Sequence, residues 1–225
     1  MNLVFATNNK NKLKEIRNLL DKKFTLLSLA DINCTDELPE TCATIEGNAS
    51  QKAWYVFEKV RSRGFGVRSK KNSQLRTSVS ELHPRSSRGP DSQLICFADD
   101  TGLEIDALGG KPGVISARYA GELCYAEDNI RKVLQEMKGI KNRKAKFRCV
   151  LSLIINSKET QFEGRMEGTI LTEKKGADGF GYDPIFQPKG LNKSFAEMIL
   201  EEKNRISHRA VAVRKLEEFL SGLGK

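Results

Sequence analysis

The 225-residue sequence lacks any long apolar run, which limits where the protein can work. A membrane-spanning helix needs about 18 or more consecutive apolar residues, and no stretch here approaches that length. The N-terminal stretch MNLVFATNNKNKL also lacks the basic start and apolar core of a secretion signal. We therefore expect a soluble, cytoplasmic chain that makes no use of a membrane.

Cysteine and histidine are scarce, which argues against several kinds of site. The five cysteines are odd in number and no two have C-x-x-C spacing, so we expect reduced thiols and no thiolate metal site. Only two histidines are present, His83 and His208. The sequence has no zinc-ligand spacing, no Ser-His-Asp order, no dinucleotide fingerprint and no internal repeat.

Positive charge is in surplus, but most of it belongs to one segment. Residues 61–93 hold eight Lys and Arg against two acids, and so account for +6 of the formal net charge of +9. The segment is rich in Ser, Arg and Gly and has neither helical nor strand periodicity. We interpret it as a mobile insertion without a function of its own, with a polyanion-binding arm as the alternative. The remaining +3 does not favour nucleic acid as a partner.

Outside this segment, strand and helix patterns alternate. Apolar runs predict buried strands at 3–7 and 94–98, and alternation predicts a long strand at 146–156 paired with 159–171 as a hairpin. Apolar residues at helical spacing predict helices at 9–22, 46–60, 126–139 and 206–220, the last with Ser207 as its N-cap. Strand–helix units combined with a hairpin indicate an α/β fold, with a mixed sheet and flanking helices.

A polar turn, TNNKNK, follows the first strand and precedes a helix. A helix N-terminus offers unpaired N–H groups and a partial positive charge, so this turn is a candidate phosphate cradle. It is not a Walker loop, because G-x-x-x-x-G-K-[ST] is absent. The alternative is a polar helix cap. The residues concerned are Thr7, Asn8, Asn9, Lys10, Asn11 and Lys12.

Two adjacent carboxylates, Asp99 and Asp100, follow the apolar run at 94–98, and Thr101 comes next. Ionised carboxylates are costly to bury, and they are explained if the strand ends in a crevice where Mg²⁺ sits between them and a phosphate. Successive strand residues point to opposite faces, so we expect one acid to brace the loop and the other to face the metal. The alternative is an ordinary turn that ends the strand.

Two later clusters add aromatic faces and hydrogen-bond donors. The loop GADGFGYDPIF contains Phe180, Gly181, Tyr182 and Asp183, and its rings could stack on a planar base. The stretch EEKNRISHRA contains Lys203, His208 and Arg209, which suit oxygen atoms of a base or phosphate. A tight turn and a structural histidine are the alternatives. Together, the clusters indicate a ligand with phosphates, a metal and a base.

The sequence resembles the inosine triphosphate pyrophosphatase family in FATNNKNKLKEI, FADDTGLEIDALGGKPGVISARYAGE, KFRCVLSLII, GFGYDPIF and EEKNRISHRAVAV. These stretches follow the family order and span nearly all of the chain outside residues 61–93. The resemblance implies one catalytic domain over residues 1–225 with two lobes around a cleft, interrupted by the basic insertion. It also implies a homodimer and Mg²⁺-dependent hydrolysis of ITP, dITP and XTP to the monophosphate and pyrophosphate.

The same resemblance implies roles for individual residues. Residues 7–12 would hold the triphosphate, Thr101 would touch the substrate, and Asp100 would act as general base and metal contact. Glu40 would be the second metal ligand, with Glu46 as its competitor because Gly47 stands where relatives often carry an acid. Facing the base would be Phe180, Gly181, Tyr182, Asp183, Lys203, His208 and Arg209.

Donors on His208 and Arg209 would pair with a 6-oxo group and would reject the 6-amino group of ATP. Asn8 and Asn11 stand where many relatives have glycine, which could alter the phosphate loop slightly. Two other functions stay open: a nucleic-acid-binding module that uses the insertion, and a nucleotide sensor that has lost turnover.

Overall fold

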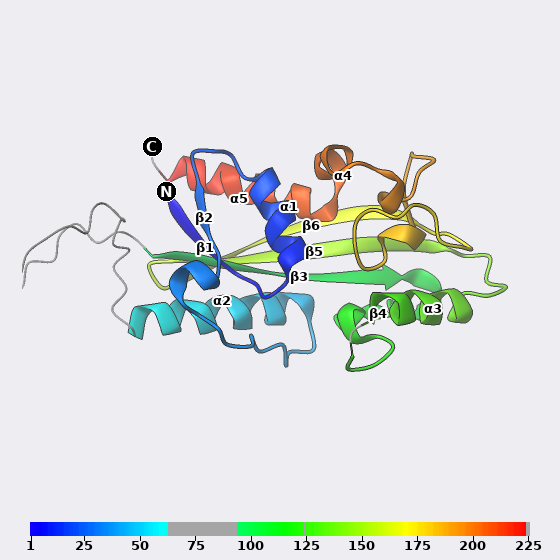
Figure 1. Ribbon diagram of the computed structural model, residues 1–225, viewed down its shortest axis with the longest axis horizontal. Coiled ribbons are helices and arrows are strands. Elements are labelled where there is room, and N and C mark those ends of the chain that lie inside the picture. Colours follow the sequence, from blue (N-terminus) through cyan, green and yellow to red (C-terminus); the bar gives the residue numbers. More distant parts are fainter. Residues whose placement is uncertain (63–93, 124, 224–225) are drawn as a thin grey trace, which may run out of the picture.

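The computed structural model describes residues 1–62, 94–123 and 125–223 (Figure 1). Expectations for the basic segment beyond Ser62 therefore lie outside the described residues. The strands are β1 (Asn2–Ala6), β2 (Thr25–Leu27), β3 (Ile95–Ile105), β4 (Pro112–Gly113), β5 (Lys144–Ile155), β6 (Lys158–Ile170) and β7 (Phe186–Pro188). The α-helices are α1 (Lys10–Leu19), α2 (Ile45–Ser62), α3 (Ala126–Glu136), α4 (Leu200–Ile206) and α5 (His208–Gly222).

The strands form one mixed seven-stranded sheet in the order β2-β1-β3-β5-β6-β7, with β4 paired to β3. β1 runs parallel to β2 and β3, and the other pairs are antiparallel. Helices α1, α4 and α5 cover one face, and α2 and α3 cover the other (Figure 1). The predicted α/β class with a mixed sheet and flanking helices is confirmed, as is the hairpin formed by β5 and β6.

β3 is longer than the sequence predicts, and the prediction that it ends before the acidic pair is wrong. It runs for 11 residues through Asp99 and Asp100. The reason lies in its neighbours, because β5 pairs with β3 along its whole length whereas β1 ends at Ala6, opposite Ala98. The two acids therefore lie within a strand, at the point where one neighbouring strand stops.

The apolar cores divide the molecule into two lobes. In the first lobe, one core packs α1 and α5 on the sheet and another packs α2 on its opposite face. The second lobe has its own core, which includes Leu103, Val133, Phe147 and Phe186 at the far end of β3 and β5. Residues of both lobes line the same cavity, so the predicted central cleft is confirmed.

The sequence predicts reduced thiols and no membrane-spanning helix, and the described residues bear on both predictions. Cys34, Cys42, Cys96 and Cys149 are free thiols, and all except Cys42 are buried. None of the helices in residues 1–62, 94–123 and 125–223 combines the length and apolar character that crossing a membrane requires.

The first turn of α5 lies directly against β6, and a glycine permits this approach. Ser207 caps α5, as predicted, by accepting a hydrogen bond from the backbone N–H of Ala210. A Cβ atom at Gly164 would lie 1.9 Å from the carbonyl oxygen of His208 and 2.6 Å from the backbone nitrogen of Ala212. Both obstacles are backbone atoms, so α5 could accommodate a side chain at Gly164 only by moving away from the sheet.

We therefore expect Gly164→Ala to destabilise the protein by about 1–3 kcal/mol, the usual cost of overpacking a core. Urea denaturation followed by circular dichroism measures the loss. The control is Gly222→Ala in α5, where an added Cβ would meet nothing within 4 Å. Equal stability of the two variants would show that the close approach of α5 to β6 does not constrain the fold.

Candidate active site

A cavity of about 510 Å³ lies between the lobes and gathers nearly all of the predicted site residues. They come from the turn after β1, the loop before α2, the middle of β3, the loop around residue 180, and helices α4 and α5. The predicted residues that line it are Thr7, Asn8, Asn9, Asn11, Lys12, Glu40, Asp100, Thr101, Phe180, Gly181, Tyr182, Asp183, Lys203, His208 and Arg209. Lys10 is the exception, because it is the exposed first residue of α1 and lies outside this lining.

The two adjacent acids of β3 point to opposite faces of the sheet. Asp99 faces α1 and α5, where its carboxylate meets Lys12 and Arg209. Asp100 faces α2, where its Oδ1 accepts a hydrogen bond of 3.0 Å from Nζ of Lys52. Strand alternation thus separates the pair into two different environments, as predicted from the sequence.

Lys52 is a site residue that the sequence interpretation missed. Its side chain is nearly fully buried, and its ammonium donates to Glu40 as well as to Asp100. Burial lowers the pKa of Lys52, but the two carboxylates outweigh this effect and raise it, so the cation is retained. A signal was available, because a lysine interrupts the buried stripe of α2 between Ala49 and Val56.

Glu40, and not Glu46, belongs to the cavity. Glu40 lines it and also meets Arg118, whereas Glu46 forms an ion pair with Arg148 and is not among the lining residues. Burial raises the pKa of Asp100, and Lys52 offsets this rise only in part. Glu37 also lines the cavity, but Glu40 and Asp100 are the two lining carboxylates that share the Lys52 ammonium of α2.

These two carboxylates suit a divalent cation. Within residues 1–62, 94–123 and 125–223 no group of three acids, histidines or cysteines forms a complete metal site. However, Oδ2 of Asp100 is buried and has no hydrogen-bond partner among the described residues. Mg²⁺ is commonly held by one or two carboxylates together with substrate phosphates, so the donor set fits an ion that binds with its substrate.

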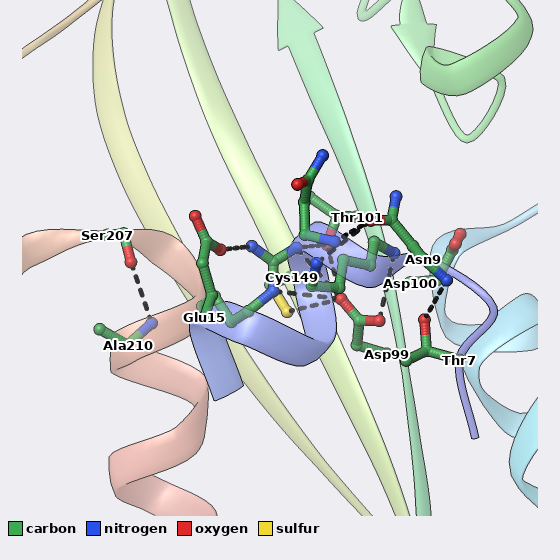
Figure 2. Close-up of polar contacts among 12 residues, drawn as sticks. Thr7, Asn9, Glu15, Asp99, Asp100, Thr101, Cys149, Ser207 and Ala210 are labelled. Atoms are coloured by element: carbon green, nitrogen blue, oxygen red, sulfur yellow. Dashed lines mark hydrogen bonds and ion pairs between the residues drawn. The ribbon is translucent and has the colours of Figure 1, made fainter. Parts of the chain in front are cut away.

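A chain of buried ion pairs runs along the other face of the sheet, and Figure 2 shows its section around Glu15 and Asp99. Its members alternate in sign and sum to zero charge: Lys12, Asp99, Arg209, Glu15, Lys203 and Asp183. All except Lys12 are nearly fully buried. Burial opposes ionisation of Asp99, but Lys12 and Arg209 hold its pKa well below the usual range. The chain connects the predicted phosphate turn to the predicted base loop.

Arg209 has little hydrogen-bonding capacity left for a ligand. Of its five N–H donors, four are committed to bonds within the protein, two of them to Asp99 Oδ2 and one each to Glu15 and Thr101. One N–H is left over. The sequence suggested a cluster of hydrogen-bond donors here, but most N–H groups of Arg209 are used within the protein and cannot bind a ligand.

His208 and Phe180 form the walls of the predicted base site. The His208 ring stacks on Phe147, with centroids 4.7 Å apart and an angle of 14° between the planes. Burial, reinforced by the nearby Arg209 and Lys203 cations, lowers the pKa of His208 well below its usual value, so the ring is neutral. Its Nδ1 is buried and has no partner within the described part of the chain. The Phe180 ring lies over Nζ of Lys203 at 4.9 Å.

The other predicted base contacts hold the loop in place. Asp183 accepts a hydrogen bond of 2.8 Å from the backbone N–H of Phe180 and pairs with Lys203. Gly179 has φ +76°, and a Cβ there would lie 2.2 Å from Asp183 Oδ2. The Tyr182 hydroxyl donates to the carbonyl oxygen of Ser116, a lining residue that the sequence interpretation also missed. These contacts fix where Phe180 lies.

At the phosphate turn, the helix-cap alternative describes part of the geometry. Oδ1 of Asn9 accepts hydrogen bonds from the backbone N–H groups of Asn11 and Lys12, so neither group is free for an anion. Thr7 Oγ1 accepts from Asn9 N–H, and the Asn8 side chain donates to the carbonyl oxygen of Asp36. The Lys12 ammonium is the cation that this turn directs toward the cavity.

Together, the fold and cavity define an α/β protein with a cleft lined by carboxylates, lysines and aromatic rings. The chain belongs to the Ham1 family, whose family model matches residues 3–219. This membership confirms the resemblance on which the residue assignments were based.

Curated relatives and solved structures match over nearly the whole chain. A dITP/XTP pyrophosphatase of Flavobacterium johnsoniae is 46% identical over 221 residues, covering 98% of each chain. The Bacillus subtilis dITP/XTP pyrophosphatase is 42% identical over 221 residues, covering 96% of each. The Ham1 proteins of Staphylococcus aureus and Coxiella burnetii superpose with TM-scores of 0.76 and 0.78, each at 31% identity and 99% coverage of both chains.

Glu15 provides a test of the buried ion chain. Burial opposes its ionisation, but Arg209 and Lys203 lower its pKa below the ordinary value of 4.5. Glu15→Gln leaves both cations without a shared counterion, so we expect a loss of about 3–5 kcal/mol at pH 7. A carboxyl whose pKa is lowered by folding stabilises the fold at pH values above its pKa in the unfolded state. The difference in unfolding free energy between the unmodified chain and Glu15→Gln should therefore shrink as the pH falls below 4.5, toward the lower pKa of the folded state.

Urea titrations at pH 7 and at pH 4 measure both effects. The control is Glu201→Gln, which changes an exposed acid on α4 and should shift stability by less than about 0.5 kcal/mol. A difference between Glu15→Gln and the unmodified chain that does not change with pH would contradict the assignment of an ionised Glu15 to this network.

Proposed function

We propose that the chain hydrolyses non-standard purine nucleoside triphosphates (ITP, dITP and XTP) to the nucleoside monophosphate and pyrophosphate. One observation carries the proposal: a single cavity joins two carboxylates and two lysine ammonium groups to a neutral histidine beside an aromatic loop. The first group suits a triphosphate with its cation, and the second suits a planar base. The names of the relatives, dITP/XTP pyrophosphatase, support the same substrates.

Glu40 and Asp100 are the residues that would hold Mg²⁺. Bound there, the ion would neutralise phosphate charge and so favour attack at phosphorus. Lys52 keeps the two carboxylates side by side, because its ammonium contacts both of them. This contact also compensates their mutual repulsion before the substrate and its cation arrive.

Asp100 is the residue that we assign as general base. It orients a water molecule, and one water proton passes to the carboxylate as the water oxygen attacks the phosphorus that carries the nucleoside. Pyrophosphate leaves with the electron pair of the broken P–O bond. Lys12 and Lys52 stabilise the negative charge that develops on the phosphate oxygens. Oδ2 of Asp100 accepts no hydrogen bond from the described residues, so one of its lone pairs can accept this proton while the other would meet the cation.

Base selection rests mainly on His208. A neutral imidazole with an unpartnered nitrogen can donate to a 6-oxo group, and the spare N–H of Arg209 can do the same. With the proton of the neutral ring on Nδ1, a 6-amino group would place donors against donors and leave buried groups unpaired, which disfavours ATP. Phe180, supported by the Lys203 cation, offers a face on which the base can stack.

We also propose a domain organisation, an oligomeric state and a location for the protein. Residues 1–225 form one catalytic domain with a basic insertion at about 61–93. The protein acts in the cytoplasm as a homodimer, and catalysis requires neither nucleic acid nor a membrane. Size-exclusion chromatography with light scattering measures the oligomeric state directly.

We expect Asp100→Asn to lower kcat for ITP by roughly 10²–10⁴-fold, because general-base catalysis is worth about that much. The assay is pyrophosphate release from ITP in the presence of Mg²⁺. Asp106→Asn is the matched control, since Asp106 follows β3 directly and is exposed outside the cavity. Turnover of Asp100→Asn close to that of the control would remove Asp100 from the role of base.

We expect kcat/KM for ITP to exceed that for ATP by at least about 10²-fold, because a buried donor is left unpaired by the wrong base. His208→Phe keeps a flat ring against Phe147 and removes the imidazole nitrogens, so this preference should fall toward one. Both substrates are compared in the same pyrophosphate-release assay. If the variant retains the full preference for ITP, His208 does not read the base.

A further inference from the structure

The carboxylate of Asp99 lies between two cations that belong to opposite ends of the cavity. Its Oδ1 is 3.1 Å from Nζ of Lys12, which comes from the phosphate turn. Its Oδ2 is 3.2 Å from Nη2 of Arg209, which comes from the base end. The Asp99 side chain is completely buried, so water does not screen either contact. One acid therefore balances a phosphate-side cation and a base-side cation at the same time.

The two contacts differ in kind. Arg209 donates two N–H groups to Oδ2, and the Thr101 hydroxyl also donates to Oδ2 while accepting from Nη2 of Arg209. Oδ1, by contrast, meets a single cation, the ammonium of Lys12 at 3.1 Å, and the Lys12 side chain is 14% exposed toward the cavity. Lys12 can therefore turn toward an arriving anion by giving up one contact, whereas Arg209 is buried and would have to give up several hydrogen bonds to leave Asp99.

A phosphate that draws Lys12 away changes the environment of Asp99. The carboxylate then lacks its second cation in a place without water, where charge interactions are strong. Arg209 becomes the cation on which Asp99 depends most, and its guanidinium is held more firmly beside His208 and Phe180. A better-fixed base site binds the base more tightly, because less ordering has to occur on binding.

We propose that Asp99 is a positioning residue that couples phosphate binding at Lys12 to base recognition at Arg209. The inference deepens the proposed function and rests on it. Asp99 touches neither ligand in this assignment and acts through the two cations. The coupling is reciprocal, so a bound base tightens phosphate binding by the same factor.

A purely structural role for Asp99 makes a different prediction. If Asp99 only supported the fold, replacing it would weaken both ends of the cavity but would not alter how one ligand affects the other. Coupling between two ligands is therefore the decisive quantity, and it can be measured with the two halves of the substrate separately. Inosine supplies the base and sugar without charge, and inorganic pyrophosphate supplies the anion.

The experiment is isothermal titration calorimetry of inosine, without pyrophosphate and with saturating pyrophosphate, in Mg²⁺ buffer. We expect pyrophosphate to tighten inosine binding by about 5-fold or more in the unmodified protein, within the usual range of allosteric coupling. In Asp99→Asn this factor should fall to one. Independent binding in the unmodified protein, or an unchanged factor in Asp99→Asn, overturns the proposal.

Two further variants keep the test decisive. Asp183→Asn is the matched control, because Asp183 is equally buried and also pairs with a cation, Lys203, but does not contact Lys12 or Arg209 directly. It should weaken inosine binding and keep the coupling factor. If Asp99→Asn does not fold, Thr101→Val replaces it, since loss of the bridging hydroxyl should reduce the factor while the Asp99 charge is kept. An unchanged factor in Thr101→Val then overturns the proposal.

Hydrolysis of ITP distinguishes failure of the proposed activity from failure of the coupling through Asp99. Absence of pyrophosphate release by the unmodified protein refutes the proposed function, and the inference with it. Release of pyrophosphate from ITP together with a coupling factor of one refutes only the assignment to Asp99.

Discussion

The buried pairing of Arg209 with Glu15 and Asp99 is the constraint on which the rest of the structure depends. A guanidinium removed from water is tolerated only if its charge and donors are matched, and here two carboxylates from distant elements provide this match. Glu15 belongs to α1, Asp99 to β3 and Arg209 to α5. The pairing therefore fixes three elements relative to one another, and it places the phosphate turn and the base site at a set separation.

Backbone features make this pairing possible. The absence of a side chain at Gly164 lets the first turn of α5 approach β6, which brings Arg209 down to the sheet. The early end of β1 at Ala6 leaves one side of β3 unpaired from Asp99 to Gly102, before β4 pairs with Leu103, so polar side chains can gather there within a strand. The charged site thus occupies a gap in the sheet and not a loop at its edge.

Local patterns in the sequence predicted most helices and strands. They missed the length of β3 and the role of Lys52, because both depend on contacts between residues far apart in the sequence. Helical spacing located α1, α2, α3 and α5, because each buries one apolar stripe. The length of β3 could not be read locally, since Asp99 and Asp100 continue the strand only because β5 pairs with them. Lys52 was missed for a related reason, as its partners Glu40 and Asp100 are 12 and 48 residues away.

Residue types at the site could be predicted, but not how their hydrogen bonds are distributed. Glu15 and Arg209 are 194 residues apart, and nothing local shows that they share a bond. Once Arg209 is committed to Glu15 and Asp99, recognition of the base falls largely to His208. The same cations also favour the neutral form of that ring, because Arg209 and Lys203 reinforce the lowering of its pKa by burial. The ion chain thus both limits the donors of Arg209 and sets the protonation state of the residue that replaces them.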